Sequence, residues 1–171
     1  MRIRQAQLSD LDAITEIYNE AIQMTTASFD TEPKTREEQL QWFAEHGARH
    51  PILVAELDGS VVGWSCLSPW SSRCAYNATA ESTFYVKDGY RGRGIGRRLK
   101  GAVIDEARRL GFHVLIEQIA EGSHASRHLS EAFGFEHVGT LKEVGRKFGK
   151  VLDVYLYELI LNRPPGSKSG P

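Results

Sequence analysis

Glu81-Ser-Thr-Phe-Tyr-Val-Lys-Asp-Gly-Tyr-Arg-Gly-Arg-Gly-Ile-Gly-Arg-Arg-Leu99 joins a strand, a glycine-rich turn and the start of a helix in one segment. Residues 82–86 are apolar or β-branched, as in a strand. Polar residues then interrupt the run, and Gly92, Gly94 and Gly96 open a helix. Glycine lets the backbone come close to a ligand. Because the first N–H groups of a helix lack intrahelical partners and carry the positive end of its dipole, this segment predicts a phosphate or pyrophosphate site.

Other glycine-rich motifs fit this segment less well. Four arginines, Arg91, Arg93, Arg97 and Arg98, add positive charge around the turn. A nucleoside-triphosphate loop is excluded, because that motif requires Lys and then Ser or Thr after its last glycine, whereas Gly96 is followed by two arginines. A dinucleotide fingerprint is disfavoured, since it needs the spacing G-x-G-x-x-G in an opening βαβ unit, whereas this mid-chain segment has G-x-G-x-G. An ordinary strand-to-helix turn with a solvated basic face is the structural alternative.

Length and composition indicate one domain. The chain has 171 residues, 25% of them charged, and a formal net charge of −1. This length suffices for a continuous core without disulfides or metals. The balanced charge excludes a global basic field for nucleic acid. Cys66 and Cys74 form no C-x-x-C pair, so we expect neither a structural disulfide nor a zinc site.

The ends of the chain carry two further expectations. The opening residues, MRIRQAQLSD, lack the apolar core of a signal peptide, and no run of about 18 apolar residues is present. We therefore expect a cytoplasmic protein. Residues 163–171 are rich in Pro, Gly and Ser, which predicts a disordered tail after one domain at residues 1–162.

The remaining pattern alternates strands and helices. Strands are expected at residues 3–6, 52–57, 61–67, 82–86, 113–119, 135–141 and 151–161. Two helices should begin at the capping boxes Ser9/Asp12 and Thr35/Glu38. A third follows the glycine turn, and a fourth runs from about residue 123 to residue 134. Asp58-Gly59-Ser60 predicts a tight hairpin turn. The order βααββ, then βαβαββ, favours a mixed sheet covered by helices.

Several of these segments carry a family resemblance. The pattern Arg91-x-x-Gly94-x-Gly96, directly after a strand, resembles the coenzyme A pyrophosphate loop of the GNAT acyltransferase superfamily. Further segments resemble the phosphinothricin and methionine sulfoximine N-acetyltransferases of that superfamily: residues 29–34 (FDTEPK), 68–76 (SPWSSRCAY), 79–83 (TAEST) and 145–149 (GRKFG) with Asp153. The resemblance extends from about residue 3 to residue 161.

The resemblance implies an α/β (α+β) fold and a cofactor site. The fold is a GNAT-like mixed, mostly antiparallel sheet flanked by helices, in which a β-bulge splays two neighbouring strands to hold acetyl-CoA. Main-chain groups of residues 84–86 would contact the pantetheine arm as an added strand does, and residues 92–97 would hold the pyrophosphate. No metal is implied. The cofactor residues implied in this way are Phe84, Tyr85, Val86, Arg91, Gly92, Arg93, Gly94, Ile95, Gly96, Arg97, Ser123 and Ala132.

The resemblance also implies transfer of an acetyl group to the α-amine of methionine sulfoximine, methionine sulfone or phosphinothricin. A free amino-acid amine is mostly protonated at neutral pH, so a base must remove a proton before the amine attacks. Glu81 matches the family's Glu and is the expected general base, acting directly or through a water. A backbone N–H near Tyr85 or Val86 would stabilise the oxyanion. The acceptor residues implied are Phe29, Trp70, Arg73, Cys74, Ala75, Tyr76, Glu81, Ser82 and Thr83.

Two positions depart from the family pattern. Ser130 stands where many members have Tyr and the herbicide-resistance enzymes have His to protonate the departing thiolate. A serine hydroxyl is a poor general acid, so either the thiolate leaves unaided or His124, His128 or a tyrosine substitutes. Ser123 stands where the family has a cofactor-contacting Asn.

Other functions remain open at this point. The acceptor amine can instead be a polyamine, an aminoglycoside or a protein N-terminus, although these favour an acidic or extended groove. A non-catalytic acyl-CoA sensor is the alternative from a different class, and Ser130 favours it while Glu81 disfavours it. By analogy with the family we expect a homodimer.

Overall fold

The computed structural model describes residues 1–162, which build one seven-stranded sheet in the order β1-β2-β3-β4-β5-β7-β6. Neighbouring strands are antiparallel except β4 and β5, which run parallel, so the expected mixed, mostly antiparallel sheet is confirmed. The tail expected at residues 163–171 lies outside the described residues. The strands are β1 (Arg2–Gln5), β2 (Ile52–Leu57), β3 (Ser60–Pro69), β4 (Thr79–Val86), β5 (Val114–Ala120), β6 (Glu136–Lys147) and β7 (Lys150–Ile160).

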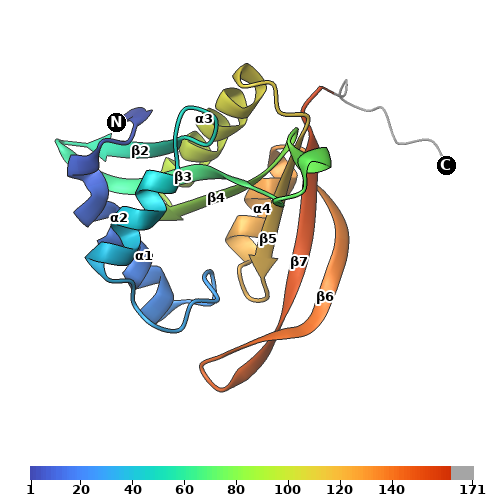
Figure 1. Ribbon diagram of the computed structural model, residues 1–171. Coiled ribbons are helices and arrows are strands. Elements are labelled where there is room, and N and C mark those ends of the chain that lie inside the picture. The colour runs from blue at the N-terminus through green and yellow to red at the C-terminus, as the bar shows by residue number, and fades with distance from the viewer. Residues whose placement is uncertain (163–171) are drawn as a thin grey trace.

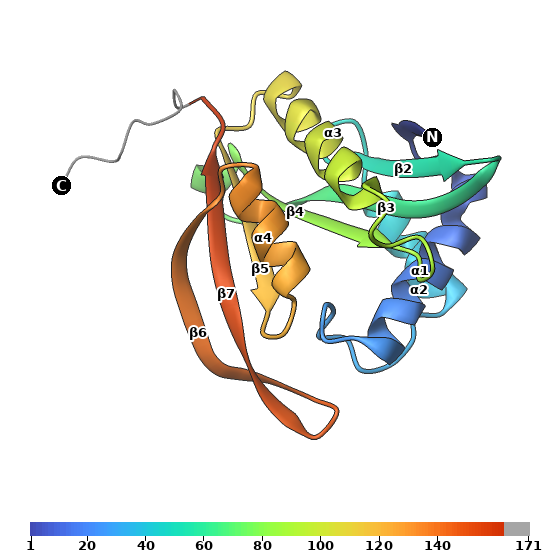
Figure 2. The ribbon, with the colours of Figure 1, turned by 180° about the vertical axis from the view of Figure 1, so that it is seen from behind.

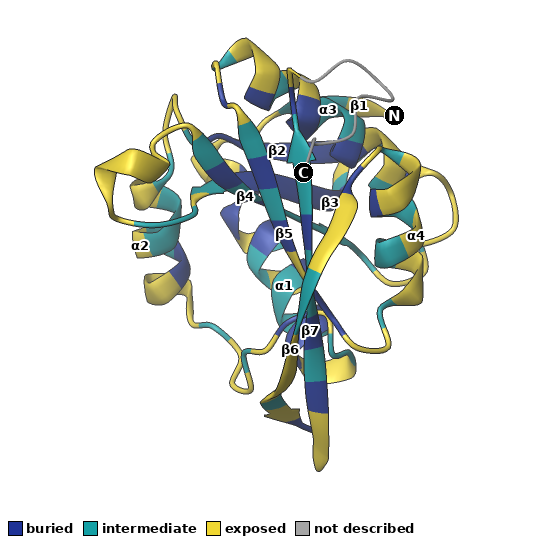
Figure 3. Cartoon of the chain, turned by 90° about the vertical axis from the view of Figure 1, so that its right-hand side faces the viewer, coloured by how far each residue is buried: buried dark blue, intermediate teal, exposed yellow. Residues whose placement is uncertain are grey.

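Helices cover both faces of this sheet. Helices α1 (Leu11–Met24) and α2 (Arg36–Glu45) lie on one face, and α3 (Ile95–Arg109) and α4 (His124–Ala132) lie on the other (Figures 1 and 2). Ile14 and Ile17 of α1 pack with Trp64 of β3, and Val103 of α3 packs with Leu115 of β5. Buried residues concentrate in the strands and on the inner faces of the helices (Figure 3). The predicted order of elements is confirmed.

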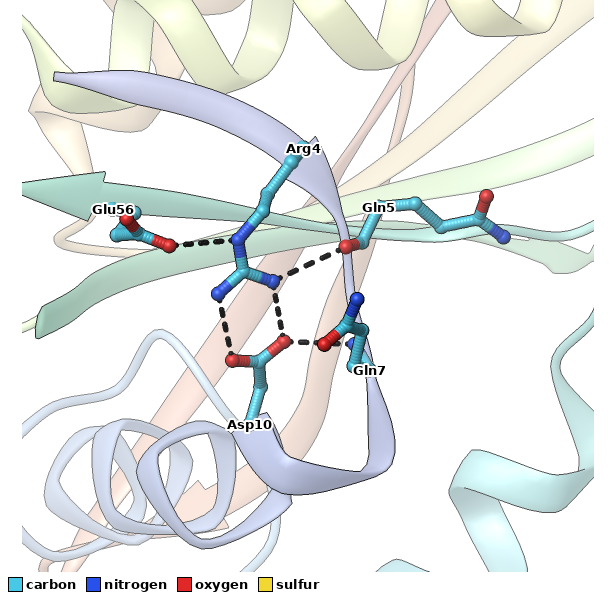
Figure 4. A network of polar contacts seen from close by, with 5 residues as sticks. All are labelled: Arg4, Gln5, Gln7, Asp10 and Glu56. Atoms are coloured by element: carbon cyan, nitrogen blue, oxygen red, sulfur yellow. Dashed lines mark hydrogen bonds and ion pairs between the residues drawn. The ribbon is translucent and has the colours of Figure 1, made fainter. Parts of the chain in front are cut away.

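The start of α1 differs from the prediction. A 3₁₀ turn at Leu8–Asp10 precedes the helix and contains Ser9, so the Ser9/Asp12 capping box is wrong. The Asp10 carboxylate accepts hydrogen bonds from both terminal nitrogens of Arg4, at 2.6 and 2.9 Å, and from the N–H of Gln7 at 2.8 Å (Figure 4). A bidentate Arg–carboxylate pair outweighs a neutral serine cap, which explains where the helix begins.

Two other local signals are confirmed. Thr35 Oγ1 accepts from the N–H of Glu38, whose carboxylate accepts from the N–H of Thr35, as a capping box requires. Asp58 and Gly59 both adopt positive φ, 51° and 79°, which the hairpin between β2 and β3 needs.

Three strands are longer than predicted, beginning with β3, which covers Ser60–Pro69 rather than residues 61–67. β4 begins at Thr79 rather than at residue 82, and β6 continues to Lys147 rather than ending at residue 141. Residues 142–147 are mostly polar, yet Lys142 forms an ion pair of 2.7 Å with Asp153 of β7 across a register shift. The β6–β7 hairpin consequently extends beyond the rest of the sheet (Figure 1).

β4 and β5 diverge after a short parallel ladder. They pair only at Thr79/Val114, Ala80/Leu115 and Glu81/Ile116. Beyond that point residues 82–86 stay paired with β3, and residues 117–120 stay paired with β7. The β3–β4 register shows no shift, so the sheet opens where β4 and β5 diverge, without the expected β-bulge in this strand pair. We call the opening between residues 82–86 and 117–120 the fork.

Candidate active site

A cavity of about 680 Å³ adjoins the fork. This volume lies in the range of small-molecule sites. We distinguish two parts by their lining. The fork side includes Ser82, Phe84, Ile119, Ala120, Ser123 and Ser126, and the aromatic side includes Tyr18, Trp42, Trp64, Cys66, Ser68 and Tyr85.

Glu81 lies where the two parts meet, in the last residue pair before the strands diverge. Its carboxylate accepts a hydrogen bond of 3.1 Å from Gln118 Nε2 of β5. Burial raises the pKa of Glu81 above its ordinary value of 4.5; the bond from Gln118 partly opposes this shift, and the charge of Glu117 adds to it. A carboxylate with a raised pKa takes up a proton more readily near neutral pH, as a general base must.

Beside Glu81 lie the thiol of Cys66 and the hydroxyl of Ser68. Burial raises the pKa of the Cys66 thiol to about 12, so it stays protonated at neutral pH. Ser68, which faces Glu81 across the β3–β4 ladder, lies 3.3 Å from His46 Nε2. The other ring nitrogen of His46 lies 2.8 Å from the carbonyl oxygen of Trp42, which fixes the ring at the end of α2. The thiol is therefore not a nucleophile at neutral pH, and Ser68 and His46 lie within hydrogen-bond reach of each other.

The edge of β4 directs backbone groups into the fork. Lys87 donates its N–H to the carbonyl of Val62 on β3 at 3.0 Å. Because hydrogen-bonded pairs alternate along an antiparallel ladder, Tyr85 also directs its backbone groups to β3, whereas Phe84 and Val86 direct theirs to the open edge. Of the three strand residues implied as pantetheine contacts, Phe84 and Val86 thus have main-chain groups on the correct side. Tyr85 lines the cavity with its ring.

The three glycines of the turn have different physical roles. Gly92 and Gly94 adopt φ of 76° and 78°, a conformation that other residues rarely take. Gly96 lies in the first turn of α3, and a Cβ atom there would come 3.1 Å from the Phe84 ring. Gly92 and Gly94 therefore shape the turn, and Gly96 allows α3 to approach β4. The N–H groups of the first turn of α3 have no intrahelical partners.

The arginines of the turn are not equivalent. Arg91 donates to the carbonyl of Val86 at 3.2 Å and to Glu20 of α1 at 3.3 Å, so it braces the loop. Arg93 and Arg97 lie over the rings of Tyr90 and Phe133 and form no ion pair within residues 1–162. Their exposed charges are available to a phosphate.

Four aromatic rings build the aromatic side. Trp64 lies in edge or tilted contact with Tyr18, Trp42 and Tyr85, with centroids 5.0–5.9 Å apart. The Trp64 Nε1 atom is buried and has no hydrogen-bond partner among the described residues. Because a buried N–H normally has an acceptor, this group is consistent with a ligand or water that supplies one.

The loop between α1 and α2 forms a wall of the cavity with Ala27, Ser28, Phe29 and Asp30. The Tyr18 hydroxyl donates to Asp30 at 2.6 Å. Two residues of the β6–β7 hairpin support this wall from outside. The buried Lys147 donates to the carbonyl of Ser28 at 2.6 Å, and a Cβ atom at Gly145 would overlap the Phe29 ring.

The cavity carries few free charges. Asp30 accepts from Tyr18 and pairs with Lys34 at 3.2 Å, and Glu38 is engaged in the capping box of α2. Glu117, the remaining lining carboxylate besides Glu81, pairs with Lys100 at 2.8 Å. Lys34 is the one Lys or Arg residue among the described lining side chains. Glu81 is therefore the carboxylate that stays available to a bound ammonium group.

Part of the predicted acceptor set lies elsewhere. Phe29, Glu81, Ser82 and Thr83 line the cavity, but five residues after β3 do not, and one of them, Tyr76, lines a separate hollow of about 380 Å³. Their role in acceptor binding stays a prediction. These five residues are Trp70, Arg73, Cys74, Ala75 and Tyr76.

Two of the predicted cofactor residues flank α4. Ser123 lines the fork side, whereas Ala132 is exposed at the other end of the helix and outside the cavity. Ser130 is fully buried and lies behind the cavity wall, where its hydroxyl oxygen accepts from Lys100 Nζ at 2.7 Å. His124 and His128 are both exposed on α4.

Several lining residues were not singled out from the sequence. Trp64, Cys66 and Ser68 share one face of β3 because side chains alternate along a strand, and that period-2 pattern was a usable signal. Tyr18, Trp42 and Gln118 had no comparable signal, because their proximity to Glu81 depends on how α1, α2 and β5 pack. No cluster of three potential metal ligands occurs in residues 1–162. Among the same residues no helix is long and apolar enough to cross a membrane.

A sheet that opens beside a glycine turn, with a half-buried carboxylate at the fork, is the arrangement that the resemblance to acyltransferases predicts. Residues 12–135 match the Acetyltransferase (GNAT) family. The chain belongs to this family and is an N-acetyltransferase related to the phosphinothricin and methionine sulfoximine acetyltransferases.

Three comparisons support the assignment. The chain is 37% identical to an L-amino acid N-acyltransferase of Escherichia coli and 37% identical to an L-methionine sulfoximine/L-methionine sulfone acetyltransferase of Salmonella typhimurium, each over 95% of both chains. The crystal structure of a GNAT superfamily phosphinothricin acetyltransferase from Sinorhizobium meliloti, in complex with acetyl-CoA, is 31% identical. It superposes with a TM-score of 0.91 over 99% of this chain and 92% of the other.

Proposed function

We propose that this enzyme transfers the acetyl group of acetyl-CoA to the α-amine of a small amino-acid analogue, with Glu81 as general base. The observation that carries the proposal is the position of Glu81 at the fork, with a raised pKa, where the fork side and the aromatic side of one cavity meet. Residues 1–162 are proposed to form a single acetyltransferase domain.

The residues around the fork fit acetyl-CoA. The main-chain groups of Phe84 and the N–H of Val86 face the open edge and suit the pantetheine arm as an added strand would, whereas the Val86 carbonyl already accepts from Arg91. The first turn of α3, with Arg93 and Arg97, suits the pyrophosphate, and Ser123 offers a hydroxyl on the fork side. When bound, acetyl-CoA supplies the acetyl group.

Glu81 performs the proton transfer in this proposal. Its carboxylate accepts a proton from the acceptor ammonium, directly or through a water, and leaves a neutral amine. Attack of this amine on the acetyl carbonyl would form the C–N bond and break the C–S bond, so that coenzyme A would leave as a thiolate and take up the second amine proton. Gln118 holds the carboxylate in place. The backbone N–H of Phe84 points to the open edge close to Glu81 and is the proposed oxyanion donor, an effect typically worth about 3 kcal/mol.

The lining of the aromatic side indicates the acceptor class. Aromatic rings stabilise an ammonium group, and Glu81 offers the negative charge. A phosphinate would meet no free cation in the described lining, because Lys34 is paired with Asp30. A neutral sulfone or sulfoximine does not need one. We therefore rank methionine sulfone and methionine sulfoximine above phosphinothricin. Arg73 is not counted as a cation for the phosphinate, because it does not line the cavity.

One observation favours a second candidate. Four carboxylates line the cavity against one lysine, which suits a polyamine: Asp30, Glu38, Glu81 and Glu117. Because all of these except Glu81 have partners of their own, we place this acceptor second.

An acceptor panel tests the proposal. Release of free thiol from acetyl-CoA is measured with methionine sulfone, methionine sulfoximine, phosphinothricin and spermidine, and kcat/KM is compared. We expect the order given by the charges: sulfone and sulfoximine first, phosphinothricin lower by at least about tenfold, as one unpaired charge implies. A higher kcat/KM for spermidine would reverse the ranking. No release with any amine, despite tight coenzyme A binding, would instead identify an acyl-CoA sensor.

The assembly state and location complete the proposal. A homodimer is supported by exposed apolar side chains on the β6–β7 hairpin, including Leu141, Val144 and Phe148, which are 41–55% exposed. Light scattering that gives the mass of one chain at micromolar concentration would contradict it. A cytoplasmic location stays a prediction.

A further inference from the structure

A charged pair is buried toward the α3/α4 face of the sheet, and one of its two members, Glu117, also lines the cavity. Lys100 of α3 and Glu117 of β5 are 1% and 5% exposed, and their charged atoms lie 2.8 Å apart. The Lys100 ammonium also lies over the rings of Phe84 and Phe135. Buried ion pairs are often no more stable than apolar residues of similar volume, because desolvation offsets their attraction. Stability alone therefore does not account for this pair.

The pair connects the elements that form the fork. The Glu117 carboxylate accepts hydrogen bonds from Ser82 of β4 at 2.8 Å, from Lys100 at 2.8 Å and from Ser130 of α4 at 2.6 Å. Ser82 and Glu117 are the first residues after backbone pairing between β4 and β5 ends. A side-chain bridge thus continues the contact between the two strands where the ladder stops.

The residues next to Ser82 and Glu117 in the two strands are Glu81, the proposed base, and Gln118. Successive side chains of a strand point to opposite faces. Ser82 follows Glu81 on β4, and Gln118 follows Glu117 on β5. Ser82 and Glu117 are therefore joined on the α3/α4 face, and Glu81 and Gln118 are joined on the α1/α2 face, at 3.1 Å. Because these residues are adjacent in the chain, a shift of the Ser82–Glu117 contact must also move Glu81 and Gln118.

We propose that Lys100 and Glu117 are positioning residues for acetyl transfer: with Ser130 they fix the Ser82–Glu117 bridge, which sets the width of the fork and the place of Glu81 and Gln118. The inference rests on the proposed function, since it concerns the step that Glu81 performs. Lys100 and Glu117 act through their neighbours and need no contact with the reacting atoms.

The first test removes both charges and keeps the volume. In Lys100→Met/Glu117→Met we expect Tm to stay within about 4 °C of wild type, because apolar replacement of a buried pair costs little. We expect kcat with methionine sulfone to fall about 10- to 100-fold, the usual effect of displacing a reacting group by about 1 Å. The KM for acetyl-CoA should change by less than about threefold. A kcat within twofold of wild type would overturn the inference.

A matched variant separates the bridge from simple packing. Lys100→Met/Glu117→Gln keeps a carbonyl oxygen that accepts from Ser82, so kcat should return to within about threefold of wild type. Equal losses in both double variants would overturn the role of the bridge. If the methionine variant does not fold, Ser82→Ala removes the same bridge by itself and should lower kcat by about 5- to 10-fold. An unchanged kcat in Ser82→Ala would then overturn the inference.

A control and the wild type complete the design. Arg4→Met/Asp10→Asn removes a partly buried ion pair remote from the cavity and should lower Tm without changing kcat. An active wild type with an equally active methionine variant overturns only the positioning role. A wild type that transfers acetyl to no acceptor overturns the proposed function and, with it, this inference.

Discussion

The fork side and the aromatic side of the cavity are built in different ways. On the fork side the groups proposed to bind acetyl-CoA belong mainly to the backbone, at the open edge of β4 and in the first turn of α3, which lies outside the cavity lining. On the aromatic side they are side chains from α1, α2, β3 and β4. A backbone site depends on local conformation, whereas a side-chain site depends on packing between distant segments. The two sides should therefore respond separately to substitution.

The largest effect is expected at Glu81, where both sides meet. Glu81→Gln keeps the shape of the side chain and removes the base, so kcat should fall by about 100-fold or more. The dissociation constant of coenzyme A, measured by calorimetry, should change little, because the fork side is intact. An unchanged kcat would contradict the role of Glu81 as the group that acts where the fork side and the aromatic side meet.

The next effect should be confined to the fork side. Gly94→Val forces a β-branched residue into φ near 78°, which costs about 1–3 kcal/mol of strain and shifts the turn. We expect the KM for acetyl-CoA to rise about tenfold and the KM for methionine sulfone to change little. Gly47→Val is the matched control, since Gly47 has no positive φ and open space around it. A larger change for the acceptor than for acetyl-CoA would refute the separation.

A smaller effect should be confined to the aromatic side. Gly145→Ala places a Cβ atom on the Phe29 ring and displaces the wall formed by the loop after α1. We expect the KM for methionine sulfone to rise about 3- to 10-fold, with an unchanged KM for acetyl-CoA. Gly139→Ala on the same strand meets no neighbouring atom and serves as control. Equal kinetics for the two variants would show that Phe29 does not form the acceptor wall.

The smallest effect on activity should come from Asp10, which belongs to neither side. The Arg4 guanidinium holds the pKa of Asp10 below its usual value of 3.8, so the pair stabilises the fold above that pH and its contribution is lost as pH falls through the lowered pKa. Asp10→Asn should reduce the free energy of unfolding by about 1–3 kcal/mol at pH 7. Denaturation should show this difference shrinking in acid, with kcat unchanged at pH 7. A difference that is constant with pH would contradict the pairing.

The same contrast explains what the sequence predicts. The glycine turn, the order of elements and the Asp58-Gly59 hairpin were predictable because each depends on residues close together in the chain. The Ser9/Asp12 capping box was wrong because Arg4 draws Asp10 into a stronger pair. The end of β6 was placed too early because polar residues 142–147 are held in the strand by β7.

The site was predictable on its fork side and much less on its aromatic side. Glu81 and residues 84–86 were predicted as site residues because the strand before the turn resembles the family's cofactor-binding strand. Trp42 and Gln118 reach the cavity only through the packing of α2 and β5, and no local pattern indicates that. The Lys100–Glu117 pair was also not foreseen, since a lysine and a glutamate 17 residues apart carry no signal of a shared buried contact.

The pH dependence of kcat/KM for methionine sulfone tests the central claim most directly. Glu81 must be deprotonated to act, and burial raises its pKa, so activity should fall on the acid side with an apparent pKa above 4.5. This acid limb should be present in the wild type and absent from the residual activity of Glu81→Gln. An acid limb that persists unchanged in Glu81→Gln would show that another group is the base.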